Sequence, residues 1–247
     1  PRTAFVIITH INRLSCVLLL FSVRSNLKFV IMNSVQLKVD CFGNVENPIT
    51  KKRDAIKKFT WESSNGMSVS LISYGAIIQS IKVPDRAGII EDVVLGFDDI
   101  AGYRKSNNPY FGALVGRVAN RIARGEFKLK GETFNIAKNW NNLHHLHGGV
   151  IGFDKFNFNH HLDGNVVYLS HLSPDGYEGY PGDVLVTVKC ELKADNSLVM
   201  EYQATTTKPT PINLTNHSYF NLGGHVRKIC TLAVSYTHLT LPTIYSV

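Results

Sequence analysis

Residues 184–192 read Val-Leu-Val-Thr-Val-Lys-Cys-Glu-Leu, with apolar side chains at every second position. Because successive side chains of a strand point to opposite faces, this pattern predicts a half-buried antiparallel strand. The alternation resumes over residues 198–205, after Ala194-Asp195-Asn196, a sequence typical of a turn. We therefore expect the two segments to pair as a β-hairpin.

The same period of two recurs along the chain, and no long segment shows the period of a helix. A second hairpin is expected where apolar residues 127, 129, 134 and 136 flank Lys130-Gly131-Glu132. Further strands are expected over residues 67–83, 92–96 and 166–171, with turn-forming breaks at 84–88 and 173–176. Many short strands joined by turns predict an all-β fold, a sandwich or a barrel.

Charge is distributed unevenly along the chain. Residues 1–58 hold ten Lys/Arg and three Asp/Glu, whereas residues 59–247 hold sixteen of each, so the net charge of +7 belongs to the N-terminal segment. The rest of the protein is neutral, which argues against a nucleic-acid partner. Arg117 and Arg124 form no stacking stripe either, because no aromatic residues interleave with them.

The four cysteines, at positions 16, 41, 190 and 230, are far apart and form no Cys-x-x-Cys pair. This spacing favours a reducing, cytoplasmic compartment over a zinc or redox site. Cys190 fits a small buried hydrophobic residue within its strand.

Both ends of the chain depart from this pattern. An apolar run over residues 16–23, flanked by Arg13 and Arg24, resembles the centre of a signal peptide but is too short to span a bilayer. We interpret residues 1–31 as translated upstream sequence or an extension outside the fold, with a secretion signal as the alternative. Residues 32–234 form the expected β-sandwich domain, and the uncharged residues 235–247 form an atypical tail.

Two stretches carry the chemistry: Leu-His-Gly-Gly-Val-Ile-Gly-Phe-Asp-Lys at 146–155 and Asn-Leu-Thr-Asn-His-Ser-Tyr-Phe-Asn-Leu-Gly-Gly at 213–224. Each places one imidazole among small residues, amides and hydroxyls. Small residues let a ligand approach the backbone closely, and the polar groups can bond its hydroxyls. The pattern favours a sugar site.

Together with Gly-Ala-Leu-Val-Gly-Arg-Val-Ala-Asn-Arg-Ile-Ala-Arg-Gly at 112–125, these stretches closely resemble the aldose 1-epimerases, or galactose mutarotases, from about residue 59 to 225. The resemblance implies a large twisted antiparallel β-sandwich, the galactose mutarotase-like supersandwich, here incomplete, with sugar bound in a cleft on one face. It also implies an isomerase of hexose metabolism that interconverts the α and β anomers of galactose and glucose. Such an enzyme needs no cofactor and no metal.

The resemblance assigns roles residue by residue. His217 matches the acid that protonates the ring oxygen, a role that suits an imidazole because its usual pKa is about 6.5. His147 matches a histidine that bonds the substrate and polarises its reacting end. Asn120 and Arg121 match a pair that binds sugar hydroxyls, and Ser218 and Tyr219 fall where the family contacts sugar.

These motifs also contain residues typical of two other kinds of site. His144, His145 and His147 suggest zinc, but adjacent residues of an extended chain point to opposite faces, and no carboxylate or thiolate lies nearby in sequence. We interpret His144 and His145 as solvated loop residues.

Asp175 and Glu178 suggest a glycosidase pair. Pro-Asp-Gly is turn chemistry, however, so we assign both carboxylates a structural role bordering the cleft. His171, just ahead of them, is expected to be a strand residue.

One part of the family pattern is missing. The family places a catalytic glutamate and a substrate-binding aspartate after the Asn-His-Ser-Tyr word, but no acidic residue follows Glu201. We therefore expect a truncated enzyme that lacks its base, acting on small hexoses as a monomer or weak dimer, with no nucleic acid or membrane as partner. The alternative is a catalytically inactive carbohydrate-binding β-sandwich protein, and an epimerase of hexose 6-phosphates ranks below both.

Overall fold

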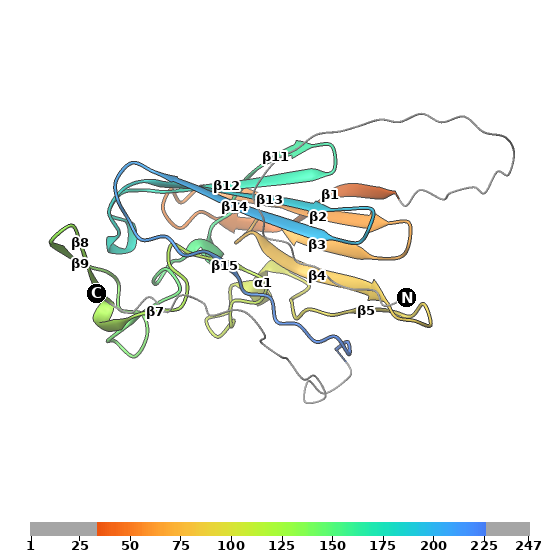
Figure 1. Ribbon diagram of the computed structural model, residues 1–247, viewed down its shortest axis with the longest axis horizontal. Coiled ribbons are helices and arrows are strands. Elements are labelled where there is room, and N and C mark those ends of the chain that lie inside the picture. Colours follow the sequence, from red (N-terminus) through yellow and green to blue (C-terminus); the bar gives the residue numbers. More distant parts are fainter. Residues whose placement is uncertain (1–33, 226–247) are drawn as a thin grey trace, which may run out of the picture.

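The computed structural model describes residues 34–225, which fold into two antiparallel sheets (Figure 1). The first sheet has the order β1 (Val35–Glu46), β2 (Arg53–Ser63), β3 (Ser68–Ile72), β4 (Ile77–Pro84), β5 (Ile90–Asp92). The second has the order β11 (Asn159–Asp163), β12 (Val166–Ser173), β13 (Val184–Leu192), β14 (Leu198–Thr206). In both sheets each strand pairs with its neighbour in sequence, as in a meander.

Short elements lie in the long connection between the two sheets, between β12 and β13, and after β14. Three two-stranded pairs are formed by β6 (Leu114–Val115) with β15 (Thr215–Asn216), β7 (Arg121–Ile122) with β10 (His145–Leu146), and β8 (Glu126–Leu129) with β9 (Glu132–Asn135). The helical elements of the described residues are α1 (Ile100–Tyr103) and the 3₁₀ turns η1 (Ala123–Gly125), η2 (Phe153–Lys155) and η3 (Tyr177–Gly179). The pairs β6–β15 and β7–β10 join the motif segments that the sequence singles out.

The predicted hairpins are confirmed. β13 and β14 pair antiparallel, with Val188 opposite Tyr202, and β13 buries its even-numbered residues. β8 and β9 pair around Lys130-Gly131, as expected.

The strand expected at 92–96 is wrong, because β5 ends at Asp92. The Asp92 carboxylate accepts the backbone N–H groups of Ile81 and Val94, each at 3.1 Å, and so takes the place of a continued ladder. Val94 then forms only an isolated bridge with Phe220.

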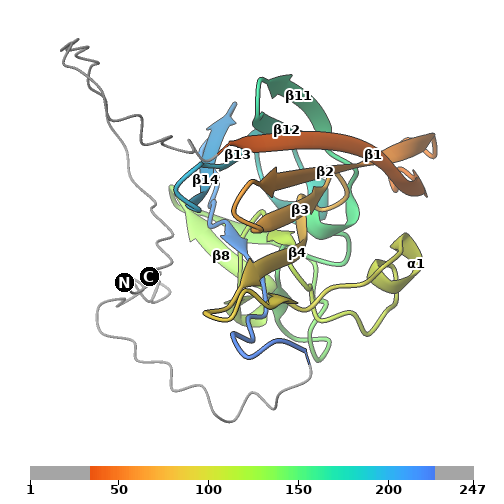
Figure 2. The same cartoon turned by 90° about the vertical axis from the view of Figure 1, so that its right-hand side faces the viewer.

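The two sheets pack face to face around one apolar core, which confirms the all-β sandwich (Figure 2). Phe59 and Trp61 of β2, both 0% exposed, share this core with Leu169 of β12 and Val186 of β13. Burial of each such side chain contributes about 1.5–3 kcal/mol. Trp61 also donates its indole N–H to the carbonyl of Asn165 at 2.6 Å, which ties β2 to the β11–β12 turn.

Several expectations fall outside the described residues: the extension 1–31, the tail 235–247, and Cys16 and Cys230. Cys190 is buried in β13, as predicted, and Cys41 is exposed. Within residues 34–225, no helix has the length and apolar character needed to cross a membrane.

Candidate active site

His147 and His217, far apart in sequence, lie side by side. Their ring centroids are 5.1 Å apart and the rings are nearly perpendicular, at 87°. His217 is placed by the β15–β6 ladder, which continues past the strand ends: the backbone N–H of His217 donates to Ala113 O at 2.9 Å, and Gly112 N–H donates to His217 O at 3.2 Å.

Asn120 holds His147 from the other side. The backbone N–H of Asn120 donates to Nδ1 of His147 at 3.0 Å, and the backbone N–H of His147 donates to the Asn120 carbonyl at 3.0 Å. The adjoining β7–β10 pair, in which Leu146 lies opposite Arg121, fixes the register of these bonds. The three motifs of the sequence therefore meet at His147.

The bond from Asn120 determines how His147 carries its proton. Nδ1 acts as an acceptor, so a neutral ring must carry its hydrogen on Nε2. Burial, together with the neighbouring His217 and Arg121, lowers the pKa of His147 to about 4. His147 is thus a neutral imidazole whose Nε2–H is a hydrogen-bond donor.

The Tyr110 ring lies against the rings of both histidines, a role that the sequence analysis missed. Its ring lies 4.8 Å from that of His147 and 5.9 Å from that of His217, and Lys155 Nζ lies 5.4 Å from its centroid. An available signal was its place two residues before the Gly112 motif. We call Tyr110, His147 and His217 the ring cluster.

The backbone around the ring cluster is strained. Tyr110, Asn120 and His147 have φ values of 63°, 64° and 53°, in the left-handed region that residues other than glycine rarely adopt. Such conformations cost free energy and concentrate at functional sites. A Cβ on the next residue, Gly148, would collide with the Gly116 carbonyl, so glycine is required there.

Arg121 and Asn120 are exposed and available to a ligand. Arg121 Nη1 donates to the Asn120 side-chain oxygen at 3.1 Å, and its guanidinium carbon lies 4.4 Å from the centre of the Trp140 ring. Stacking on Trp140 orients the planar guanidinium and leaves donors free for paired hydrogen bonds.

Ser218 and Tyr219 directly follow His217 on the same segment. The Ser218 hydroxyl is buried and has no hydrogen-bond partner within residues 34–225. The Tyr219 ring, 39% exposed, lies 5.2 Å from that of His217 and is braced edge-on by Phe111 at 5.0 Å. An unpaired hydroxyl and an exposed aromatic ring beside an imidazole can both receive a polar ligand.

The interpretation of His145 as a solvated loop residue is wrong. His145 is 0% exposed; its Nδ1–H donates to Ala137 O at 2.7 Å, and its Nε2 accepts the Tyr180 hydroxyl at 2.7 Å. Partners on both nitrogens offset the cost of burying the ring. His144 is half-buried, and its Nδ1 accepts the backbone N–H of Arg124 at 3.0 Å. In the part of the chain that the structure describes, no group of three or more His, Cys, Asp or Glu side chains is arranged to hold a metal.

Asp175 and Glu178 have structural partners, as expected. Glu178 accepts the backbone N–H groups of Val150 and Ile151 at 3.1 and 2.9 Å, and Asp175 pairs with Lys208.

His171 is the predicted strand residue, in β12. Its ring lies against those of Phe153, Phe156 and Phe158.

A family model described as aldose 1-epimerase matches residues 57–241 of this chain. The chain belongs to the aldose 1-epimerase family. It is 49% identical over 169 residues to a galactose mutarotase of Bos taurus, covering 68% of this chain and 48% of that protein. A galactose mutarotase of Homo sapiens is 47% identical over the same share of each chain.

The structural similarity agrees. The crystal structure of a galactose 1-epimerase from Lactobacillus acidophilus superposes with a TM-score of 0.65 at 30% identity, covering 77% of this chain and 54% of that chain. An aldose epimerase homologue from C. elegans gives a TM-score of 0.60 at 32% identity, covering 64% of this chain and 49% of that one. The chain thus spans about half the length of the relatives it matches.

Proposed function

We propose that this chain carries the sugar-binding groups and the acid of an aldose 1-epimerase that interconverts the anomers of galactose and glucose. The observation that carries the proposal is the contact of His147 with both Asn120 and His217, which joins the three motif segments of the family in one place. Galactose is the favoured substrate because relatives at 47–49% identity are galactose mutarotases.

The reaction needs two coupled proton transfers. A base removes the proton from the O1 hydroxyl while an acid protonates the ring oxygen, so that the bond from C1 to the ring oxygen breaks and C1 becomes an aldehyde. Rotation about the C1–C2 bond and reversal of both transfers gives the other anomer. Every proton taken up is returned, and no redox change occurs.

The two histidines suit different tasks. His147 accepts at Nδ1 and is neutral, so it donates a hydrogen bond from Nε2 without exchanging a proton with the substrate. Within residues 34–225, backbone hydrogen bonds and ring contacts hold His217, and no hydrogen bond occupies its ring nitrogens, which leaves them for chemistry. We assign the acid to His217 and the polarising donor to His147.

The substrate hydroxyls are assigned to the exposed polar groups around this pair. Arg121 and Asn120 present an exposed guanidinium and amide, Tyr219 is exposed after His217, and Ser218 adds a buried hydroxyl that is unpaired within residues 34–225. An apolar ligand would leave these hydrogen-bonding groups without partners. A polyhydroxylated ligand can bond several of them at once, so the site favours such a ligand.

Among residues 34–225 we assign no carboxylate to the role of the base. Asp154, the carboxyl of the His147 motif, interacts with His217 through charge, but its side chain is buried, one of its oxygens accepts Lys155 Nζ at 2.7 Å, and burial raises its pKa. No acidic residue follows Glu201. We therefore propose that these 247 residues supply the acid and the binding groups and need a carboxylate from elsewhere for turnover.

The alternative is a carbohydrate-binding β-sandwich protein without catalysis. The same groups would bind hexose in both cases, so only turnover separates the two. We further propose a protein that works as a monomer or weak dimer on small sugars in the cytoplasm, a reducing compartment that the spacing of the cysteines favours.

Equilibrium binding tests the sugar site itself. Galactose titrated into the 247-residue chain, followed by calorimetry, is expected to bind. His147→Asn keeps a residue that tolerates positive φ but removes the Nε2–H, so it should weaken binding by about tenfold. His161→Asn, in the exposed strand β11, is the matched control and should bind as the parent does. Absence of galactose binding to the parent chain would refute the proposed site.

A further inference from the structure

Arg117 is buried and lies between β6 and β7, in the same motif as Asn120. It is 2% exposed, and the carboxylates of Asp175 and Asp183 act on it through charge, although neither is hydrogen-bonded to its guanidinium in the described residues. Its Nε is buried without a hydrogen-bond partner in residues 34–225. Burying a cation is costly even where it is hydrogen-bonded, and a well-packed apolar side chain is often more stable at such a place. The position therefore does more than fill the core.

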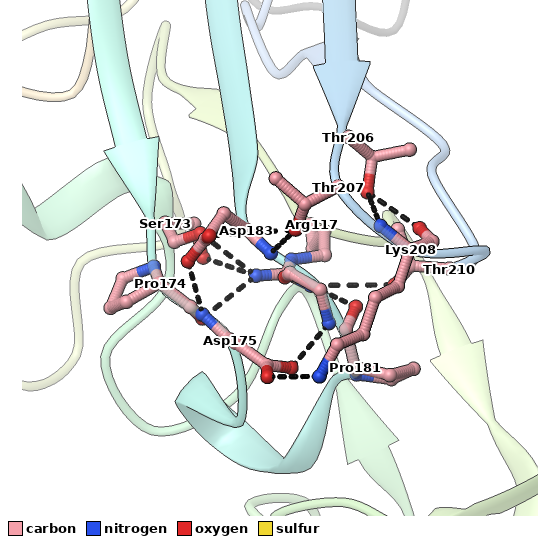
Figure 3. Close-up of polar contacts among 11 residues, drawn as sticks. Arg117, Ser173, Pro174, Asp175, Pro181, Asp183, Thr206, Thr207, Lys208 and Thr210 are labelled. Atoms are coloured by element: carbon pink, nitrogen blue, oxygen red, sulfur yellow. Dashed lines mark hydrogen bonds and ion pairs between the residues drawn. The ribbon is translucent and has the colours of Figure 1, made fainter.

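The guanidinium instead bonds two separate segments, the 173–182 loop and the 210–213 segment (Figure 3). Nη1 donates to the carbonyls of Pro181 and Gly182, at 3.0 and 2.9 Å, and to the Thr210 hydroxyl at 3.3 Å. Nη2 donates to the hydroxyl and carbonyl of Ser173, at 2.8 and 3.2 Å, and to the Pro174 carbonyl at 3.2 Å. Only a planar fork with several donors can make this set, and lysine cannot.

The 210–213 segment leads to His217. Thr210 lies just ahead of Asn213, whose backbone N–H donates to the Arg117 carbonyl at 3.0 Å, while Asn213 O accepts Ala119 N–H at 2.8 Å. Both the side chain and the backbone of Arg117 thus fix the strand that carries the acid.

The 173–182 loop leads to His147. The guanidinium carbon of Arg117 lies 5.4 Å from the centre of the Tyr180 ring, and the Tyr180 hydroxyl donates to His145 Nε2 at 2.7 Å. His145 is two residues before His147 on β10. Arg117 itself is three residues before Asn120, the partner of His147.

We propose that Arg117 is a positioning residue that fixes His147 and His217 relative to each other, by bonding the 173–182 loop and the 210–213 segment at one guanidinium. The inference rests on the proposed function for its effect on sugar but on geometry alone for its effect on the histidines. It assigns no contact between Arg117 and the substrate.

The test uses the 247-residue chain and two readouts: imidazole ¹H–¹⁵N NMR signals of His147 and His217, and galactose affinity by calorimetry. Arg117→Lys keeps the charge but loses the fork. We expect both imidazole signals to move or broaden and galactose affinity to fall by about tenfold or more. Arg124→Lys, an exposed arginine of the same motif, should change neither.

A second variant guards against unfolding of Arg117→Lys. Tyr180→Phe keeps the ring beneath Arg117 and removes only the hydroxyl bond to His145, so it should move the His147 signal and leave His217 nearly unchanged. A folded Arg117→Lys chain with parental imidazole signals would overturn the proposal. If Arg117→Lys does not fold, a parental His147 signal in Tyr180→Phe would overturn it. If the parent binds no galactose, the proposed function fails, but the imidazole signals still decide the role of Arg117.

Discussion

Asn120 and His147 are joined by two reciprocal hydrogen bonds, backbone N–H to Nδ1 and backbone N–H to carbonyl, each at 3.0 Å. Both residues have positive φ, so the strained backbone of each is held in place by the other. The pair converts His147 into a fixed donor, because the ring nitrogen that faces Asn120 is already occupied.

The first prediction follows from this pair. His147 should be neutral, with its proton on Nε2, from pH 8 down to about pH 5, because burial lowers its pKa to about 4. Imidazole ¹⁵N shifts measured across this range test it directly. A midpoint near 6.5, or a spectrum with the proton on Nδ1, would contradict the role assigned to His147.

The second prediction concerns acid stability. The His171 ring packs against those of Phe153, Phe156 and Phe158. Burial there lowers its pKa from 6.5 to about 4. Between these values the unfolded chain binds more protons than the folded chain, so the free energy of unfolding falls as the pH drops from 6.5 to 4. His171 accounts for about 2 kcal/mol of this loss at pH 5 and about 3 kcal/mol at pH 4.

His171→Phe removes the titrating group and retains an aromatic ring. Urea unfolding at pH 7.5 and at pH 5 should show a smaller loss of stability in the variant than in the parent. His145 and His147 also have lowered pKa values and act in the same direction, so part of the acid sensitivity should remain. Equal losses in variant and parent would show that His171 does not carry this linkage.

The third prediction separates structure from catalysis at Glu178. Glu178→Ala removes the acceptor for the Val150 and Ile151 N–H groups and should lower the free energy of unfolding by about 1–3 kcal/mol. Chemical denaturation measures this loss. A glycosidase activity present in the parent and lost in the variant would instead make Glu178 a catalytic carboxylate.

Much of the fold was predictable because its signal is local. The alternation over 184–192 survives in β13 because one face of that strand packs in the core. The 92–96 strand failed because one aspartate side chain, Asp92, took the backbone donors that a ladder needs. Residue type alone does not reveal that competition.

The site was predictable only in part. His147 and His217 stand in long, unusual sequence motifs, so their place near Asn120 could be expected from the family resemblance. The buried roles of His145 and Arg117 could not, because each depends on partners distant in sequence: Tyr180 for His145, and Ser173 and Thr210 for Arg117. The same holds for Tyr110, whose contacts with both histidines arise from the fold.

The most direct test of the central claim is polarimetry of α-galactose with a chimera in which residues 34–225 are followed by the C-terminal half of the Bos taurus relative. We expect conversion well above the buffered blank, and His217→Asn should slow it by about 10² to 10⁴ while galactose affinity changes little. His161→Asn should leave the rate unchanged, and the 247-residue chain alone should not exceed the blank. Full-speed conversion by the His217→Asn chimera, or by the 247-residue chain alone, would contradict the account.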